Sequence, residues 1–150
     1  MLQVGDNIPN INLTTHKGES LNLSDLKGKK IILFFYPRAN TPGCTAQSCN
    51  LNENYSNLVS QGFEVIGVSP DTVSKQNNFA NKFGFTYNLI ADDSKELIDA
   101  FGVWGKKKYM GKEYEGVLRT TFIIDKNGVI EKVIDKVNTK DHYNQIIDLS

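Results

Sequence analysis

The stretch KIILFFYPRANTPGCTAQSC, residues 30–49, decides the fold because it places a buried strand, a short loop and a helix in direct succession. The nearly continuous apolar run from Lys30 to Tyr36 predicts a strand that is buried on both faces. The segment from Pro37 to Gly43 is expected to be a loop, and a helix is expected from about Cys44 to Ser60. A doubly buried strand followed at once by a helix is typical of α/β proteins.

Strands and helices continue to alternate along the rest of the chain. The expected strands are Leu21–Leu23, Phe63–Ser69, Thr86–Ala91, Thr120–Ile124 and Val129–Val137. Two expected helices begin at the caps Ser74 and Ser94 and end at Phe83 and Gly102, and a last helix covers Asp141–Leu149. The turn Asp125–Gly128 contains Asn-Gly and predicts a late hairpin. This order predicts an α/β sandwich with a mixed sheet, in one domain over residues 1–150.

The composition excludes several classes of protein. Lysine plus arginine and aspartate plus glutamate both total 17, so neither nucleic acid nor an anionic membrane is expected as a partner. No apolar run approaches the ~20 residues of a membrane span, and the start MLQVGDNIPN lacks signal-peptide character, so a cytoplasmic location is expected. The two histidines, His16 and His142, show no zinc-site spacing and are expected at the surface, and no metal or other cofactor is expected.

Both cysteines of the chain, Cys44 and Cys49, lie on the helix that is expected after the loop. Apolar side chains recur on this helix at helical spacing and are expected to face the sheet: Leu51, Tyr55, Leu58 and Val59. At about 100° per residue, Cys44 points within roughly 20° of Leu51, so its thiol is expected to be buried. Cys49 points about 140° away from Cys44, so its thiol is expected to face water.

The position of Cys44 favours chemistry over packing. Thr41 to Gly43 place it at the helix start, where free N–H groups and the helix dipole favour the thiolate, which is the nucleophilic form of cysteine. The alternative is a buried and inert cysteine. An intact helix separates the Cα atoms of Cys44 and Cys49 by about 8–9 Å, whereas a disulfide needs about 7 Å or less. A disulfide between them therefore requires the first turns of the helix to unwind.

The residues Pro37, Thr41 and Cys44 form the pattern P-x3-T-x2-C, in which the chain resembles the peroxiredoxins. The second cysteine five residues on is similar to that of the bacterioferritin comigratory protein, or Q-type, subfamily. The resemblance spans nearly the whole chain, in the blocks GDNIPNINL, GESLNLSDLKGKKIILFFYP, FEVIGVSPD and FGVWGKKKYMGKEYEGVLRTTFIIDKNG, the last of which supplies Arg119. It implies a thioredoxin-like fold with an N-terminal extension, a monomer, reduction of hydrogen peroxide and organic hydroperoxides, and thioredoxin or a similar dithiol protein as the reductant.

The resemblance, together with the chemistry of O–O bond cleavage, implies a role for each residue. Cys44 attacks the peroxide and becomes a sulfenic acid, with which Cys49 condenses to a disulfide. Arg119 keeps Cys44 ionised and polarises the peroxide. The Thr41 hydroxyl bonds the thiolate or the peroxide oxygen, and Pro37 shapes the loop and shields the thiol.

Some of these positions carry a second interpretation. Without the family pattern, Arg119 would be a surface ion-pair residue and Thr41 a simple helix cap. Acidic residues are common in the subfamily where Arg38–Asn40 and Gln47 stand here. Lys106–Lys108 is expected to be a solvated loop.

Two other functions compete with the peroxidase. A general thiol–disulfide oxidoreductase is one, but such proteins usually carry their cysteines as C-x-x-C rather than C-x4-C. A non-catalytic redox sensor is the other, and its oxidation would begin in the same way. Turnover separates them, because a sensor is oxidised once and a peroxidase consumes many equivalents of peroxide.

Overall fold

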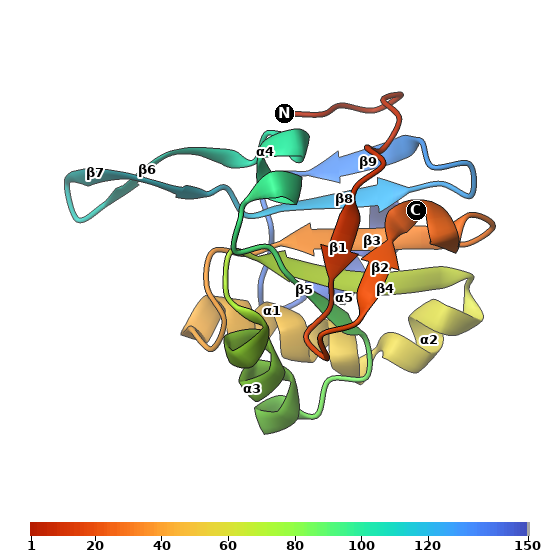
Figure 1. Ribbon diagram of the computed structural model, residues 1–150, viewed down its shortest axis with the longest axis horizontal. Coiled ribbons are helices and arrows are strands. Elements are labelled where there is room, and N and C mark those ends of the chain that lie inside the picture. Colours follow the sequence, from red (N-terminus) through yellow and green to blue (C-terminus); the bar gives the residue numbers. More distant parts are fainter. Residues whose placement is uncertain (150) are drawn as a thin grey trace.

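A five-stranded sheet forms the centre of the molecule in the computed structural model, which describes residues 1–149 (Figure 1). Its strands are, in spatial order, β5 (Asn88–Ala91), β4 (Phe63–Ser69), β3 (Lys30–Phe35), β8 (Thr120–Ile124) and β9 (Ile130–Ile134). Strand β4 is parallel to β3 and β5, whereas β8 is antiparallel to β3 and β9. The predicted α/β class with a mixed central sheet is therefore confirmed.

Helices and two small hairpins surround this sheet. The helices are α1 (Pro42–Glu53), α2 (Tyr55–Ser60), α3 (Val73–Phe83), α4 (Glu96–Phe101), α5 (His142–Leu149) and the 3-10 helix η1 (Leu23–Leu26). The hairpins are β1 (Asn12–Thr14) with β2 (Ser20–Asn22), and β6 (Trp104–Tyr109) with β7 (Lys112–Val117). Among the described residues, no helix has the length and apolar character needed to cross a membrane.

The two faces of the sheet carry separate apolar clusters, and β3 contributes to both. Ile31, Leu33 and Phe35 pack with residues of α4 on one face. Ile32 and Phe34 pack with residues of α1, α2, α3 and α5 on the other face. All five side chains are at most 2% exposed, and each such burial is worth about 1.5–3 kcal/mol. The prediction of a strand buried on both faces is confirmed, and this strand points into the loop that leads to α1.

The helix expected from Cys44 to Ser60 is broken into two. Helix α1 ends at Glu53, and Asn54, with φ −105° and ψ 10°, separates it from α2. The Asn54 amide donates to the carbonyl of Asn50 at 2.8 Å, so this side chain competes for a backbone acceptor of the helix. Because the break changes the helix phase, Leu58 is buried as expected, but Val59 is 46% exposed and does not face the sheet.

The N-cap residues of α3 and α4 differ from the two predicted serines. Thr72 caps α3 instead of Ser74, and its hydroxyl accepts from the backbone N–H of Lys75 at 3.3 Å. At α4 the cap position is Lys95, in a left-handed conformation, rather than Ser94. The buried Asp92 carboxylate accepts from the N–H groups of Ile98 and Leu97 at 2.8 and 3.1 Å, and the Ser94 hydroxyl accepts from that of Glu96 at 3.4 Å, so both side chains satisfy the first turn of α4. The predicted end of this helix at Gly102, also left-handed, is confirmed.

A long hairpin replaces the solvated loop that was expected at Lys106–Lys108. These lysines lie in β6, which pairs with β7 and projects from the body of the molecule (Figure 1). Met110 and Gly111 form its turn, both with positive φ, as two-residue hairpin turns require. Polar residues dominate both faces of the hairpin, so it lacks the apolar alternation by which strands are recognised in a sequence.

Both histidines are buried, which contradicts the expected surface positions. His142 is 0% exposed, and its ring nitrogens lie 2.8 Å from the Thr121 hydroxyl and 2.9 Å from the Gln145 carbonyl oxygen. Burial lowers the pKa of His142 to about 4, so its ring is neutral at pH 7. His16 accepts from the backbone N–H of Leu89 at 3.2 Å, and burial lowers its pKa as well. Within residues 1–149, no three His, Cys, Asp or Glu side chains gather as a metal site would require.

Candidate active site

The loop between β3 and α1 carries three of the predicted site residues. Pro37 is half-buried just beyond the end of β3, and Thr41 is the N-cap residue of α1, with extended backbone angles. Helix α1 begins at Pro42, two residues before the expected start, so Cys44 is its third residue. The Cys44 side chain is 0% exposed. The predicted sheltered thiol at a helix start is thus what the structure shows, and the first turn of an α-helix has N–H groups without partners inside the helix.

Hydrogen bonds hold this loop in place from two sides. The Thr41 hydroxyl donates to the carbonyl of Arg38 at 2.9 Å and, among the described residues, caps no helical N–H group. The Asp71 carboxylate accepts from the backbone N–H of Ala39 at 2.7 Å. Lys82 of α3 donates to the Asn40 side chain at 3.3 Å, and Asn40 itself is left-handed, with φ 63°. The loop conformation is therefore set by contacts to α3 and to the end of β4 rather than by the loop alone.

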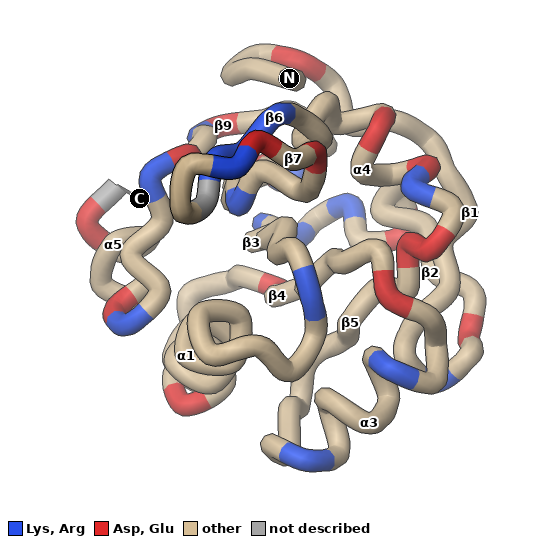
Figure 2. Tube along the Cα trace, turned by 90° about the vertical axis from the view of Figure 1, so that its left-hand side faces the viewer, with Lys and Arg blue, Asp and Glu red and all other residues tan. Residues whose placement is uncertain are grey.

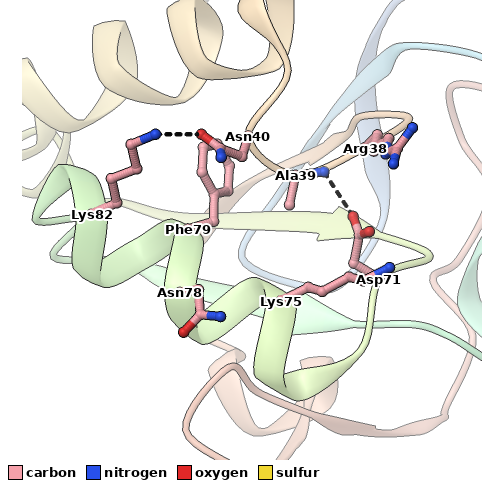
Figure 3. Close-up of a pocket in the computed structure, with 8 residues that line it drawn as sticks. All are labelled: Arg38, Ala39, Asn40, Asp71, Lys75, Asn78, Phe79 and Lys82. Carbon is pink, nitrogen blue, oxygen red and sulfur yellow. Dashed lines mark hydrogen bonds between the residues drawn. The ribbon is translucent and has the colours of Figure 1, made fainter.

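A pocket of about 260 Å³ lies between this loop and α3 (Figure 3). Its lining residues are Arg38, Ala39, Asn40, Asp71, Lys75, Asn78, Phe79 and Lys82. Figure 3 shows Lys82 reaching toward Asn40 and Asp71 toward the backbone of Ala39. Arg38, Ala39 and Asn40 thus line a pocket that carries three cationic side chains and lies beside the site.

Arg119 reaches Cys44 from a distant part of the chain. Its Nη2 atom lies 3.3 Å from the Cys44 sulfur and donates to it. Strand β8 pairs with β3 so that Thr120 lies opposite Phe35, and this register brings Arg119 to the end of β3 from which the loop departs. The half-buried guanidinium thus supplies a positive charge and a hydrogen bond at the thiol. The surface ion-pair interpretation of Arg119 is wrong.

Gln47 belongs to the site, although it was not among the residues predicted to form it. Its Oε1 accepts from Nη1 of Arg119 at 2.7 Å, and its side chain is 0% exposed. Its Nε2 atom is buried and has no hydrogen-bond partner among the described residues. Gln47 follows Cys44 by three residues, which places both on one face of α1. That spacing was the available signal, but only the tertiary structure shows that both residues face Arg119.

The wall of the site beneath Cys44 is apolar and uncharged. Tyr36 is fully buried in the same apolar cluster as Cys44 and donates to the Gln76 side chain at 2.6 Å. Burial raises the pKa of Tyr36 far above its ordinary value, so the phenol stays neutral. Because water is excluded here, the interaction between the Arg119 charge and the sulfur is weakly screened.

Cys49 lies on the same unbroken helix as Cys44, and within the described residues both thiols are free. Its side chain is half-buried, which is less exposed than the predicted water-facing position. Burial raises the pKa of the Cys49 thiol, and the nearby Glu53 carboxylate raises it further. Cys49 is therefore held as a neutral thiol while α1 is folded.

The second half of α1 is tied to its surroundings by the α1 anchor, which consists of Ser48, Asn50 and Asn52. The carbonyl of Ser48 accepts from the buried hydroxyl of Tyr87 at 2.8 Å. The Asn50 side chain accepts from the backbone N–H of Tyr143, in the first turn of α5, at 2.7 Å. Asn52 accepts from the N–H and hydroxyl of Thr86 at 2.9 and 3.0 Å and donates to the carbonyl of Gly84 at 3.2 Å. The segment that contains Cys49 is thus held at three points.

Comparison with known proteins identifies the family of this chain. A family model described as the AhpC/TSA family matches residues 4–133. Peroxiredoxin Bcp of Escherichia coli (strain K12) is 40% identical over 147 residues, which cover 98% of this chain and 94% of that protein. The chain belongs to the AhpC/TSA family of peroxiredoxins. Peroxiredoxin Bcp of Bacillus subtilis (strain 168) is 42% identical to this peroxiredoxin over 141 residues, 94% of this chain and 90% of the relative.

Solved structures place this peroxiredoxin in the Q-type, thioredoxin-like group. Peroxiredoxin Q of Xanthomonas campestris superposes with a TM-score of 0.86 at 30% identity, covering 92% of this chain and 87% of that one. A cysteine-to-serine mutant of Xylella fastidiosa PrxQ gives a TM-score of 0.92 at 28% identity, and the match covers 99% of this chain and 94% of that one. The protein is therefore a thiol peroxidase, whose substrates are a peroxide and a thiol reductant.

Proposed function

We propose that Cys44 is the nucleophile of this peroxidase and that Cys49 is its resolving thiol. The observation that carries the proposal is the 3.3 Å contact between Arg119 Nη2 and the Cys44 sulfur in a buried site at a helix start. A thiolate in this position has a guanidinium and helical N–H groups as its partners. Cys49, a neutral thiol on the same helix, has no comparable cation among the described residues that contact it.

In the first step the Cys44 thiolate attacks one oxygen of the peroxide. The S–O bond forms as the O–O bond breaks, so cysteine is oxidised to the sulfenic acid and the leaving alkoxide or hydroxide takes a proton to become an alcohol or water. Arg119 stabilises the negative charge that moves from sulfur to the leaving oxygen. The Thr41 hydroxyl, at the start of α1, donates to the thiolate or the peroxide oxygen when it turns from Arg38, and Pro37 shields the thiol.

In the second step the Cys49 sulfur attacks the sulfur of the sulfenic acid. The S–S bond forms, the S–OH bond breaks, and hydroxide leaves and takes up a proton to become water. Because an intact α1 separates the two Cα atoms by about 8–9 Å, this step requires α1 to unwind between them. Thioredoxin or a similar dithiol protein then reduces the disulfide by exchange.

The physiological setting follows from this cycle. The proposed substrates are hydrogen peroxide and organic hydroperoxides, and the proposed role is antioxidant defence and redox homeostasis in the cytoplasm. We further propose that residues 1–150 act as one domain and as a monomer, because Cys44, Cys49, Arg119 and Thr41 all come from one chain. Lysine, arginine, aspartate and glutamate are interspersed over the side seen in Figure 2, in keeping with small substrates rather than a polyanion.

Cys49→Ser tests the resolving role. This variant is expected to consume one equivalent of peroxide as fast as the wild type and then to recycle poorly with thioredoxin and thioredoxin reductase, because its sulfenic acid has no intramolecular partner. Mass spectrometry should show Cys44 sulfenic and sulfinic acids in place of the Cys44–Cys49 disulfide of the wild type. Sustained turnover at the wild-type rate would overturn the resolving role, and single-equivalent consumption by the wild type itself would favour a redox sensor.

The hydrogen bonds of the α1 anchor are expected to limit the rate of disulfide formation between Cys44 and Cys49. Asn52→Ala removes three hydrogen bonds, each worth about 0.5–1.5 kcal/mol, which must break if α1 unwinds around Cys49. We expect disulfide formation to become about tenfold faster or more, and overoxidation of Cys44 to decrease, while the first oxidation keeps its rate. Rapid-mixing experiments with quenching and mass spectrometry measure both rates.

A matched control for this change is Asn81→Ala on α3. Asn81 is exposed and bonds only to Asn77 of its own helix among the described residues, so its loss leaves the α1 anchor intact. The control should form the disulfide at the wild-type rate. If Asn52→Ala also forms it at the wild-type rate, the anchor does not restrain the unwinding.

A further inference from the structure

The hairpin β6–β7 carries three consecutive lysines, of which one differs from its neighbours. Lys106 and Lys108 are exposed, whereas Lys107, which faces the other side of the strand, is half-buried. Figure 2 shows the hairpin pointing toward the viewer, at the same end of the sheet as the start of α1. A lysine ammonium is strongly hydrated, so its partial burial calls for a compensating interaction.

The Lys107 side chain folds back along its hairpin toward Arg119. Its Nζ atom donates to the carbonyl of Val117 at 2.9 Å, and Val117 is the buried end of β7, two residues before Arg119. The side chain passes close to the backbone of Gly116, where a Cβ atom would lie in ordinary van der Waals contact with Cδ of Lys107, at 3.6 Å. The ammonium is thereby fixed at the base of the hairpin instead of extending into water.

Two residues of the site, Arg119 and Cys44, influence the charge of Lys107. Burial lowers the pKa of the Lys107 ammonium, the Arg119 guanidinium lowers it further, and Cys44 raises it. The ammonium thus lies within the fields of both the guanidinium and the sulfur. A second cation near Arg119 is unfavourable by itself, but it becomes favourable when an anion forms near both cations. The reaction supplies such an anion whenever Cys44 ionises.

We propose that Lys107 is a positioning residue of the peroxidase site, a second cation that acts with Arg119 to stabilise the Cys44 thiolate. The inference rests on the proposal that Cys44 is the nucleophile. Neighbouring ionisable groups include the neutral Tyr36 near Cys44 and the neutral His142 near Arg119. On β7, Tyr114 lies opposite Lys107, and Glu113 and Glu115 flank it.

Lys107→Met, which keeps the apolar stem and removes the charge, tests the proposal. The pH at which Cys44 is half-reactive toward iodoacetamide, followed by peptide mass spectrometry, is expected to rise by about half a pH unit or more. The rate of peroxide reduction should then fall about threefold below that pH and approach the wild-type rate above it. Lys107→Arg keeps the charge and should therefore show the wild-type pH dependence of Cys44 reactivity. A merely structural role of the side chain does not predict that this pH dependence follows the charge.

Lys106→Met and Lys108→Met are matched controls, because they remove the same charge from exposed positions on the same strand. They should leave the Cys44 profile unchanged. A wild-type profile for Lys107→Met, or an equal shift in all three variants, would overturn the inference. If instead Cys44 is not the nucleophile, the result differs, because peroxide would then fail to block iodoacetamide labelling of Cys44 in the wild-type protein. Circular dichroism of Lys107→Met and Lys107→Arg confirms that both variants are folded before either profile is compared.

Discussion

Cys44→Ser is expected to lower peroxide consumption on the order of a thousandfold or more, to the rate without enzyme. A serine hydroxyl ionises far less readily than a thiol, and neither the start of α1 nor Arg119 can make up that difference. The fold should persist, because oxygen replaces sulfur in a buried site without adding volume. NADPH oxidation in the presence of thioredoxin and thioredoxin reductase measures the turnover.

Circular dichroism of the same preparation separates loss of chemistry from loss of fold. Cys49→Ser is the matched control, because it makes the same atomic change five residues along the same helix. The control should still react once with peroxide, whereas Cys44→Ser should not react at all. Turnover by a folded Cys44→Ser protein at the wild-type rate would show that another group attacks the peroxide.

Arg119→Met is expected to lower kcat/KM for peroxide by about a hundredfold or more, the second-largest effect. The change removes the hydrogen bond to the Cys44 sulfur and the positive charge that stabilises the leaving oxygen. Stopped-flow measurement of single-equivalent oxidation reports this step without contributions from recycling. The kcat/KM of Arg119→Lys should lie between those of the wild type and Arg119→Met. An ammonium keeps the charge but lacks the two separate nitrogens with which Arg119 bonds to Gln47 and Cys44.

Arg119→Met is also expected to lower the stability of the fold, and a second substitution separates this effect from the loss of activity. Without the guanidinium, both polar atoms of the Gln47 amide are buried without partners, at a cost of about 1–3 kcal/mol. Adding Gln47→Leu removes these atoms and should recover stability in urea unfolding, but not activity. Recovery of peroxide reduction by the double variant would show that the guanidinium is not required.

Local patterns predicted most of the sheet, and their failures have local physical causes. The apolar run of β3 and the strand Phe63–Ser69 were predictable because both strands are buried on two faces. The break at Asn54 was not, because it depends on one side-chain amide competing for a helix carbonyl. The hairpin β6–β7 was missed because both of its faces are polar, and its Met-Gly turn is not among the common turn dipeptides.

In the candidate site, too, some features were predictable from the sequence and others were not. The apolar stripe through Leu51 and the turn Thr41–Gly43 predicted a sheltered thiol, Cys44, at the start of a helix, and the family resemblance added Pro37 and Thr41 to the site. The inclusion of Gln47 and the path of Lys107 could not be predicted, because each depends on which way a side chain points relative to a distant residue. The burial of His142 depends in the same way on Thr121 and on the docking of α5.

The sequence by itself determined the fold class, the strand that leads into the site and the position of the two thiols on one helix. These are short-range properties, set by hydrophobic periodicity and by the geometry of a helix start. Only the tertiary structure decided that Arg119 meets Cys44 across 75 positions of the chain, with Gln47 as its second partner. The physical reason is the register of β3 and β8, because one slip in that antiparallel pairing would turn the neighbouring side chains to the opposite face of the sheet.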